Sequence, residues 1–186
     1  MKRYIKSAIN DLTTEDLDVR NELSEDPNAS ANALLQLATD PESNVRFNVA
    51  LNENVPVQAL KILSQDKDPQ IRLAIAQNTK TPLKVLRRLF SDPDRKVRFA
   101  ALRNKNLGQG NFDIFYELAD SDDFELRLGV AENALTPVDL LEKLSKDSSW
   151  AVRRGVAENI NTPREILLAL TKDKVDFVSS VAKDNY

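Results

Sequence analysis

Leucine, isoleucine and valine recur along this chain with the spacing of a helix. A clear example is the set Leu83, Val85, Leu86 and Leu89, in which successive nonpolar residues are one to three positions apart. This spacing places them on one face of a helix of about ten residues. The segment begins after Pro82, and equivalent segments begin after Pro137 and Pro163. The pattern therefore predicts several similar amphipathic helices.

A second nonpolar segment follows each of these helices and begins with an aliphatic residue and an arginine. This pair occurs at six places: Val19-Arg20, Val45-Arg46, Ile71-Arg72, Val97-Arg98, Leu126-Arg127 and Val152-Arg153. The arginines lie 26 residues apart, except for one interval of 29, and a further interval of 26 leads to Val178-Ser179. Such a period predicts a repeat protein in which neighbouring repeats bury each other's nonpolar faces.

Polar residues recur with the same period and predict where helices end. Aspartates that favour turns precede the second segment: Asp40, Asp66, Asp92, Asp147 and Asp173. Asparagines follow the second segment: Asn52, Asn78, Asn104, Asn133 and Asn159. We expect each asparagine to end its helix in the left-handed conformation, which asparagine tolerates better than most residues. We expect the Thr-Pro pairs to begin the next helix, with the threonine hydroxyl capping free amides.

Each repeat is thus predicted to contain a helix of about ten residues, a turn, a shorter helix of about eight residues and another turn. The sequence leaves open whether the shorter helix is α or 3-10. The predicted fold is all-α, a right-handed α-solenoid of about seven repeats. We expect one repeat domain over residues 1–186, with an N-terminal cap and partial repeat at 1–25, regular repeats at 26–158 that include a longer turn at 104–111, and a C-terminal capping repeat at 159–186.

Two segments carry a family resemblance. Asn133-Ala134-Leu135-Thr136-Pro137 and Asn159-Ile160-Asn161-Thr162-Pro163 each lead into a leucine-rich helix, and this arrangement resembles the leucine-rich-repeat variant family of HEAT-like α-solenoid repeats. The resemblance covers residues 14–186 and implies an α-helix that alternates with a shorter helix, sometimes of the 3-10 type. HEAT-like relatives are usually binding scaffolds, and a few are DNA glycosylases or bilin lyases. The iron–sulfur module of one family member is not expected, because this chain has no cysteine.

The composition disfavours most catalytic and metal-binding chemistry. Without His or Cys, the chain has no Ser-His-Asp triad, thiol nucleophile or cysteine-bound zinc. An acidic cluster offers carboxylates for acid–base chemistry but follows a pattern typical of solvated helix faces: Glu117, Asp120, Asp122, Asp123 and Glu125. We therefore expect no catalytic residue, metal or cofactor. No apolar stretch has the length of a signal or a membrane span, so a cytoplasmic protein without membrane contact is predicted.

The net charge of −3 conceals two segments of opposite charge. Residues 78–105 contain nine Lys or Arg and two Asp or Glu, whereas residues 106–147 contain three and ten, respectively. The basic segment predicts binding of an acidic protein segment or a phosphate backbone, with a solvated, self-complementary surface as the alternative. Protein is favoured over nucleic acid because the acidic neighbour would repel DNA. The candidate binding residues are Arg87, Arg88, Lys96, Phe99 and Arg103.

Two sets of repeating residues suit either packing or binding. The first, the arginine ladder, comprises Arg46, Arg72, Arg98, Arg127 and Arg153. Each arginine is expected to pair with the aspartate six residues earlier or with that of a neighbouring repeat; stacked guanidinium groups that bind phosphates are the alternative. The second set follows the aliphatic by two residues and either packs between repeats or lines a nonpolar groove: Phe47, Leu73, Phe99 and Leu128.

Two local features have similar alternatives. Trp150, the only tryptophan, is expected in a turn, where it either anchors a partner or packs over the following helix. The longer turn at 104–111 is expected to be a tolerated insertion, with a binding or hinge loop as the alternative.

The sequence as a whole predicts a non-catalytic scaffold that binds a protein or peptide on the concave surface of a HEAT-like solenoid. The alternative is a nucleic-acid-binding HEAT-like protein, including the glycosylase kind, that uses the basic third repeat. An enzyme of the lyase type is a third hypothesis. The oligomeric state is left open.

Overall fold

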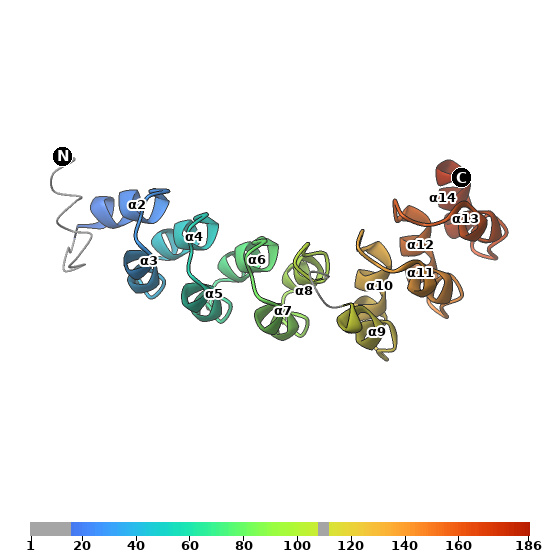
Figure 1. Ribbon diagram of the computed structural model, residues 1–186, viewed down its shortest axis with the longest axis horizontal. Coiled ribbons are helices and arrows are strands. Elements are labelled where there is room, and N and C mark those ends of the chain that lie inside the picture. The colour runs from blue at the N-terminus through green and yellow to red at the C-terminus, as the bar shows by residue number, and fades with distance from the viewer. Residues whose placement is uncertain (1–15, 108–111) are drawn as a thin grey trace. The chain divides into compact units, whose positions relative to one another are not determined.

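The computed structural model describes residues 16–107 and 112–186, and all regular structure in these ranges is α-helical (Figure 1). The first helix of each repeat, here called the A helix, is α3 (Ala31–Leu37), α5 (Val57–Leu63), α7 (Leu83–Leu89), α9 (Asp113–Ala119), α11 (Val138–Leu144) or α13 (Arg164–Leu170). The second, or B helix, is α2 (Leu17–Glu25), α4 (Ser43–Leu51), α6 (Pro69–Gln77), α8 (Arg95–Leu102), α10 (Phe124–Glu132), α12 (Trp150–Glu158) or α14 (Asp176–Asn185). This alternation confirms the predicted all-α repeat fold. Predictions that concern residues 1–15 and 108–111 lie outside the described residues.

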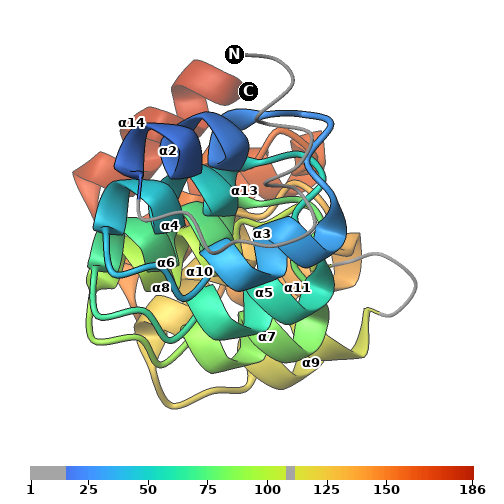
Figure 2. The ribbon, with the colours of Figure 1, turned by 90° about the vertical axis from the view of Figure 1, so that its left-hand side faces the viewer.

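The helices form two compact units, Met1–Ala101 and Leu102–Tyr186, here called the N-terminal and C-terminal units. Within the N-terminal unit α4 packs on α2 and α6, and within the C-terminal unit α12 packs on α10 and α14. Figure 2 shows the two layers in the N-terminal unit, with α2, α4 and α6 stacked behind one another and α3, α5 and α7 beside them. The predicted single domain and its two caps stay predictions.

The relative helix lengths differ from those predicted. The described A helices have seven residues each, whereas the B helices have eight to ten and are α-helices rather than 3-10 helices. In α5, α7, α11 and α13 the A helix is shorter because the proline before it lies outside the helix, at the N-cap. Pro56, Pro82, Pro137 and Pro163 all have ψ between 145° and 154°, which is outside the helical range. The Thr-Pro pair therefore adds no helical residues.

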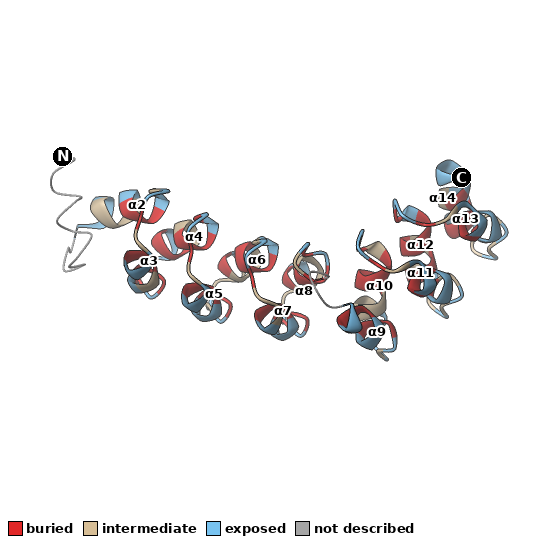
Figure 3. Cartoon of the chain, viewed as in Figure 1, coloured by how far each residue is buried: buried red, intermediate tan, exposed pale blue. Residues whose placement is uncertain are grey.

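Each unit buries its nonpolar residues between the two layers. The aliphatic residue of the aliphatic-arginine pair is inaccessible to solvent at Val45, Ile71, Val97 and Val152. Leucines of the A helices, such as Leu60 in α5, complete the core. Figure 3 shows that the buried residues occupy the facing sides of the helices and that exposed residues occupy the outer sides. Since each helix is too short to be stable alone, this burial between layers stabilises the stack.

The threonines that precede the prolines end the B helix instead of beginning the A helix. The Thr81 hydroxyl donates a hydrogen bond to the backbone oxygen of Ile75, at 2.7 Å. Thr136 and Thr162 make the same contact with the oxygen six residues earlier. The predicted capping of free amides is wrong, because proline takes the N-cap position and leaves the threonine one residue too early to reach them.

The asparagines after the B helices connect neighbouring repeats. Asn159 Nδ2 donates to the backbone oxygens of Ala131 and Asn133, at 2.7 and 2.8 Å, and its Oδ1 accepts from the N–H of Asn161. Equivalent bonds to the preceding repeat or to the turn are made by Asn52, Asn78, Asn104 and Asn133.

The predicted left-handed conformation of these asparagines is wrong. At four of the positions φ is between −65° and −74° and ψ between 121° and 128°, which is extended backbone. The side-chain oxygen closes the turn by accepting from the N–H two residues later, so the backbone does not need a positive φ. The role of asparagine here thus depends on its amide group and not on its tolerance of unusual backbone angles.

Candidate functional site

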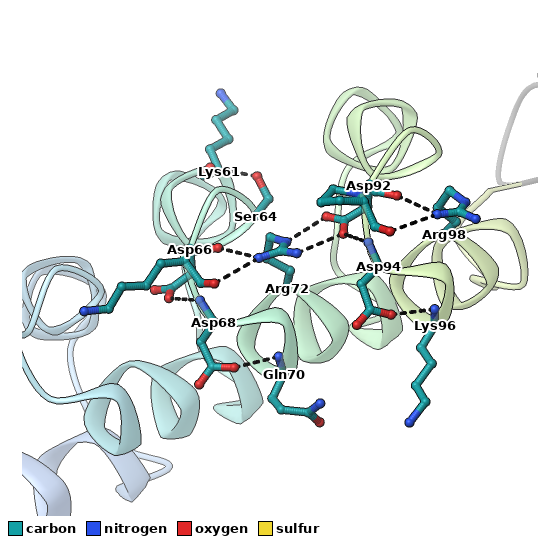
Figure 4. A network of polar contacts seen from close by, with 12 residues as sticks. Lys61, Ser64, Asp66, Asp68, Gln70, Arg72, Asp92, Asp94, Lys96 and Arg98 are labelled. Carbon is teal, nitrogen blue, oxygen red and sulfur yellow. Dashed lines mark hydrogen bonds and ion pairs between the residues drawn. The ribbon is translucent and has the colours of Figure 1, made fainter.

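The arginine ladder joins neighbouring repeats within each unit (Figure 4). Arg72 donates from Nε and Nη2 to both carboxylate oxygens of Asp92, at 2.7 and 3.0 Å, and from Nη1 to the backbone oxygen of Asp66. The other ion pairs of this kind are Arg20–Asp40, Arg46–Asp66, Arg127–Asp147 and Arg153–Asp173. The carboxylate partner belongs to the following repeat, and the aspartate six residues earlier contributes its backbone oxygen instead.

The pairs of the ladder are largely buried, and the pKa values of four of the aspartates are shifted in favour of the ionised form. Burial alone would raise the pKa of Asp66, but hydrogen bonds from Arg46 and from the backbone N–H of Asp68 outweigh it and hold the pKa below the ordinary value of 3.8. Asp92 and Asp147 behave in the same way. The hydrogen bond from Arg153 is the largest influence on Asp173 and also lowers its pKa. Since three guanidinium nitrogens donate within the protein at Arg46, Arg72, Arg127 and Arg153, these four arginines have little capacity left for a ligand.

Position 121 lacks a carboxylate of this kind. The residue there is Ser121, whose backbone oxygen accepts from Arg127 Nη1 at 2.7 Å. Arg98, in the repeat before it, donates to the backbone oxygens of Asp92 and Pro93. The backbone half of the contact is therefore kept at every described ladder arginine from Arg46 onwards.

Three of the candidate nonpolar residues share one position on consecutive B helices. Phe47, Leu73 and Phe99 are half-buried on α4, α6 and α8. Leu51, at the end of α4, is 57% exposed on the same layer. A hollow of about 390 Å³ lies between α4 and α6, and its lining includes Leu51, Ala74 and Gln77. Phe47, Leu73 and Phe99 thus form a partly exposed nonpolar row, which we call the B-face row.

Leu128 differs from the other members of its set. It is only 8% exposed. Its Cδ1 lies 2.9 Å from the place that a Cβ on Gly155 would occupy. Leu128 thus packs against the next repeat and is not part of an exposed row.

The basic candidates come from both helix layers. Arg87 and Arg88 are exposed on the A helix α7, whereas Lys96 is exposed on the B helix α8, three residues before Phe99. Arg103 follows α8 and forms an ion pair with Glu132 at 2.5 Å. Lys96 and Phe99 therefore lie on the same side of α8, whereas Arg87 and Arg88 belong to a helix of the other layer.

An exposed aromatic pair was not predicted. Trp150 begins α12 rather than lying in a turn, and its ring centroid is 5.9 Å from that of Phe177 in α14, in an edge-to-face arrangement. The guanidinium carbon of Arg154 lies 5.0 Å from the centroid of the Phe177 ring. The two aromatic residues occupy different positions of their repeats, two residues and one residue before the aliphatic. A comparison of equivalent positions in successive repeats therefore cannot predict that these two residues are in contact.

The acidic cluster serves local structure. Asp123 caps α10 by accepting from the N–H of Glu125, and Asp120 pairs with Lys143. Among the described residues, no group of three or more acidic side chains is arranged to hold a metal ion. Nor is any helix in the described ranges both long and apolar enough to cross a bilayer.

Comparison with known proteins gives the fold. No family model matches the sequence, and no curated protein matches it. The chain is similar to a solved structure described as "a leucine-rich repeat variant with a novel repetitive protein structural motif", with a TM-score of 0.62 and 23% sequence identity. The similarity covers 98% of this chain and 71% of that chain. It confirms the resemblance seen in the repeat motifs at the level of the fold, an α-solenoid of the leucine-rich repeat variant kind.

Proposed function

We propose that this protein is a non-catalytic, cytoplasmic scaffold that binds a protein or peptide partner on the exposed face of its B helices. Stacked helical repeats present extended surfaces of this kind and commonly bind other proteins. Neighbouring B helices such as α4 and α6 are in more extensive contact than neighbouring A helices such as α3 and α5. Each unit is therefore expected to curve toward its B layer, so that the B face is the concave one.

The observation that carries this proposal is the B-face row. Phe47, Leu73 and Phe99 repeat once per B helix, and the hollow beside Leu51 and Ala74 offers room for a nonpolar side chain. Packed helices lie about 8–10 Å apart. A peptide in the polyproline II conformation advances about 9 Å in three residues. The row thus fits an extended peptide with a nonpolar residue at every third position.

The charge beside the row favours an acidic partner at its α8 end. Lys96 is exposed one helical turn from Phe99, and the guanidinium of Arg95 lies 4.9 Å from the Phe99 ring centroid. A carboxylate of the partner would be attracted to these two cations. Arg46 and Arg72 of the arginine ladder add little to this attraction, because their charges are compensated by Asp66 and Asp92.

Site-specific photo-crosslinking tests the proposal. A photoreactive amino acid replaces Gln77, which is exposed on the B helix α6, or Gln58, which is exposed on the A helix α5. In extracts of the source organism, we expect a discrete crosslinked product from position 77 and not from position 58. Products of equal yield from both positions, or from position 58 alone, would contradict binding at the B face.

Nucleic-acid binding is the alternative that the charge of residues 78–105 suggests. The placement of Arg87 and Arg88 on α7, and the ion pair of Arg103 with Glu132, argue against one continuous phosphate-binding surface. We therefore expect no measurable affinity for DNA or RNA at about 50 mM salt. A salt-dependent affinity that disappears when Arg87, Arg88, Lys96 and Arg103 are reversed in charge would favour the alternative.

A further inference from the structure

We propose that the surface formed by α12 and α14 binds a basic segment of a partner protein. We call this surface the α12–α14 surface and define it by Trp150, Arg154, Glu158, Asp176 and Phe177. The inference rests on the proposed function and deepens it, because it assigns a chemical class of partner to the B layer of the C-terminal unit.

The two aromatic rings provide the nonpolar part of this surface. Trp150 is 46% exposed and Phe177 is 54% exposed, although their rings are in contact with each other. They come from consecutive repeats and therefore span two B helices. Tryptophan is among the residues that contribute most to binding at protein interfaces, and large exposed nonpolar side chains that cluster often mark such interfaces.

The chain's own Arg154 shows how this surface accommodates a cation. Its guanidinium lies over the Phe177 ring, and its Nε donates to Glu158 Oε1 at 2.8 Å. A ring face beside a carboxylate attracts a guanidinium or ammonium group by cation–π and ionic interactions together. The edge-to-face contact leaves nearly half of Trp150 exposed, so a lysine or arginine of the partner has a second aromatic surface to contact.

The surrounding charge selects a basic partner over an acidic one. Outside the arginine ladder, the B helices of the C-terminal unit carry five carboxylates that are exposed or half-buried: Glu125, Glu132, Glu158, Asp176 and Asp184. The corresponding basic side chains are Arg154 and Lys183. Arg154 is already close to Glu158 and feels the charge of Glu132. An acidic segment would meet a net negative surface, whereas a segment that combines Lys or Arg with nonpolar residues complements it.

Trp150 is the only tryptophan of the chain, so its fluorescence reports on this surface directly. The whole protein is titrated with two short synthetic peptides of equal length, one alternating Lys and Leu and the other alternating Glu and Leu. We expect the Lys–Leu peptide to shift the Trp150 emission with a dissociation constant in roughly the micromolar range. We expect the Glu–Leu peptide to produce no shift at the same concentrations.

Variants of the exposed residues locate the binding. Phe177→Ala is expected to raise the dissociation constant of the Lys–Leu peptide about tenfold, which is the loss expected at an interface anchor. Glu158→Gln is expected to weaken binding of this peptide several-fold, because the substitution removes a carboxylate without changing side-chain size. Tyr116→Ala is the matched control, since Tyr116 is an aromatic residue of the same unit that is 42% exposed on the A helix α9. Circular dichroism of each variant checks that the fold is retained.

Three outcomes of the binding measurements would overturn the inference. They are equal binding of the two peptides, no binding of the Lys–Leu peptide even at low salt, and unchanged binding by Phe177→Ala and Glu158→Gln. An emission shift that depends on protein concentration and accompanies dimer formation would also overturn it, because a second copy of the chain would then cover the surface. Since the crosslinking position Gln77 belongs to the N-terminal unit, failure here is distinguishable from failure of the proposed function.

Discussion

Gly155 lies where α12 touches α10, and Gly129 lies against Leu102, the last residue of α8. A Cβ on Gly129 would come within 2.6 Å of Leu102 Cβ and Cδ1. A Cβ on Gly155 would first meet Leu128 Cδ1, at 2.9 Å, which is the end of a side chain that can rotate. These two glycines therefore permit the close approach of the helices, and the requirement is stricter at Gly129.

Alanine substitutions at Gly129 and Gly155 are expected to have different effects on stability. Alanine gains about 1 kcal/mol over glycine inside a helix, whereas forcing extra atoms into a packed contact costs about 1–3 kcal/mol. We expect Gly129→Ala to lower the midpoint of urea unfolding and Gly155→Ala to leave it nearly unchanged. An increase of the midpoint by Gly129→Ala would show that the two helices can move apart without loss.

Asn159 makes a contact that only an amide can make. Asn159→Asp keeps the oxygen that closes the turn but places a carboxylate against the backbone oxygens of Ala131 and Asn133. Removing a buried donor costs about 1–3 kcal/mol, and more when a charge is left. We expect the free energy of unfolding to fall by at least about 2 kcal/mol at neutral pH. Asn32→Asp, at an exposed position of α3, is the control and should change little; equal effects of the two variants would refute the role of the amide.

At the scale of the helices, the sequence predicts the period and the order of the elements well. The aliphatic-arginine pair locates every described B helix except α14, where Val178 alone remains. The helix ends were predicted less well, because Thr81 and Asn78 form side-chain bonds to carbonyl oxygens that local propensity does not describe. The sequence predicts that Arg72 pairs with the aspartate six residues earlier or with that of a neighbouring repeat. Only the stacking of the repeats identifies Asp92 as the partner.

The candidate site could be predicted only where it follows the period. Phe47, Leu73 and Phe99 recur at one repeat position, and the structure places them at equivalent positions of three B helices. The contact between Trp150 and Phe177 is invisible to that comparison, because it joins different positions of two repeats. Such a pair becomes apparent only when neighbouring helices are placed side by side.

The ladder pairs are expected to matter far more for stability than the surface pairs. Asp66→Asn leaves Arg46, whose side chain is 7% exposed, without its ionic partner. Removing one member of a buried pair costs about 3–5 kcal/mol, whereas an exposed pair contributes at most about 1 kcal/mol. Urea unfolding should therefore show a large loss for Asp66→Asn and almost none for Glu142→Gln, which disrupts the exposed pair with Lys146. Similar losses for both variants would contradict this assignment.

At the scale of the whole molecule, the arginine–aspartate pairs of the ladder make the stability of the folded protein depend on pH. The pKa values of Asp66, Asp92, Asp147 and Asp173 are lower in the folded protein than their ordinary value of 3.8. The stability that these carboxylates contribute is therefore fully present well above pH 3.8 and is lost as the pH falls through their lower folded values.

The melting temperature is accordingly expected to be nearly constant from about pH 8 to about pH 5, since the chain has no histidine that would titrate in this range. It should fall steeply below about pH 4. Circular dichroism at a series of pH values measures this profile. A main loss of stability above about pH 5, or none down to about pH 2, would contradict it.

The proposed binding surface of the molecule is the B face. Two exposed aliphatic residues of the N-terminal unit provide a matched comparison: Leu51 is 57% exposed on the B helix α4, and Ile62 is 39% exposed on the A helix α5. The most direct measurement is quantitative recovery of the partner identified by crosslinking, using purified wild type, Leu51→Glu and Ile62→Glu as bait. We expect Leu51→Glu to reduce recovery about tenfold, as a charge in a nonpolar contact should, and Ile62→Glu to recover as much as wild type. Loss with Ile62→Glu and full recovery with Leu51→Glu would contradict the claim.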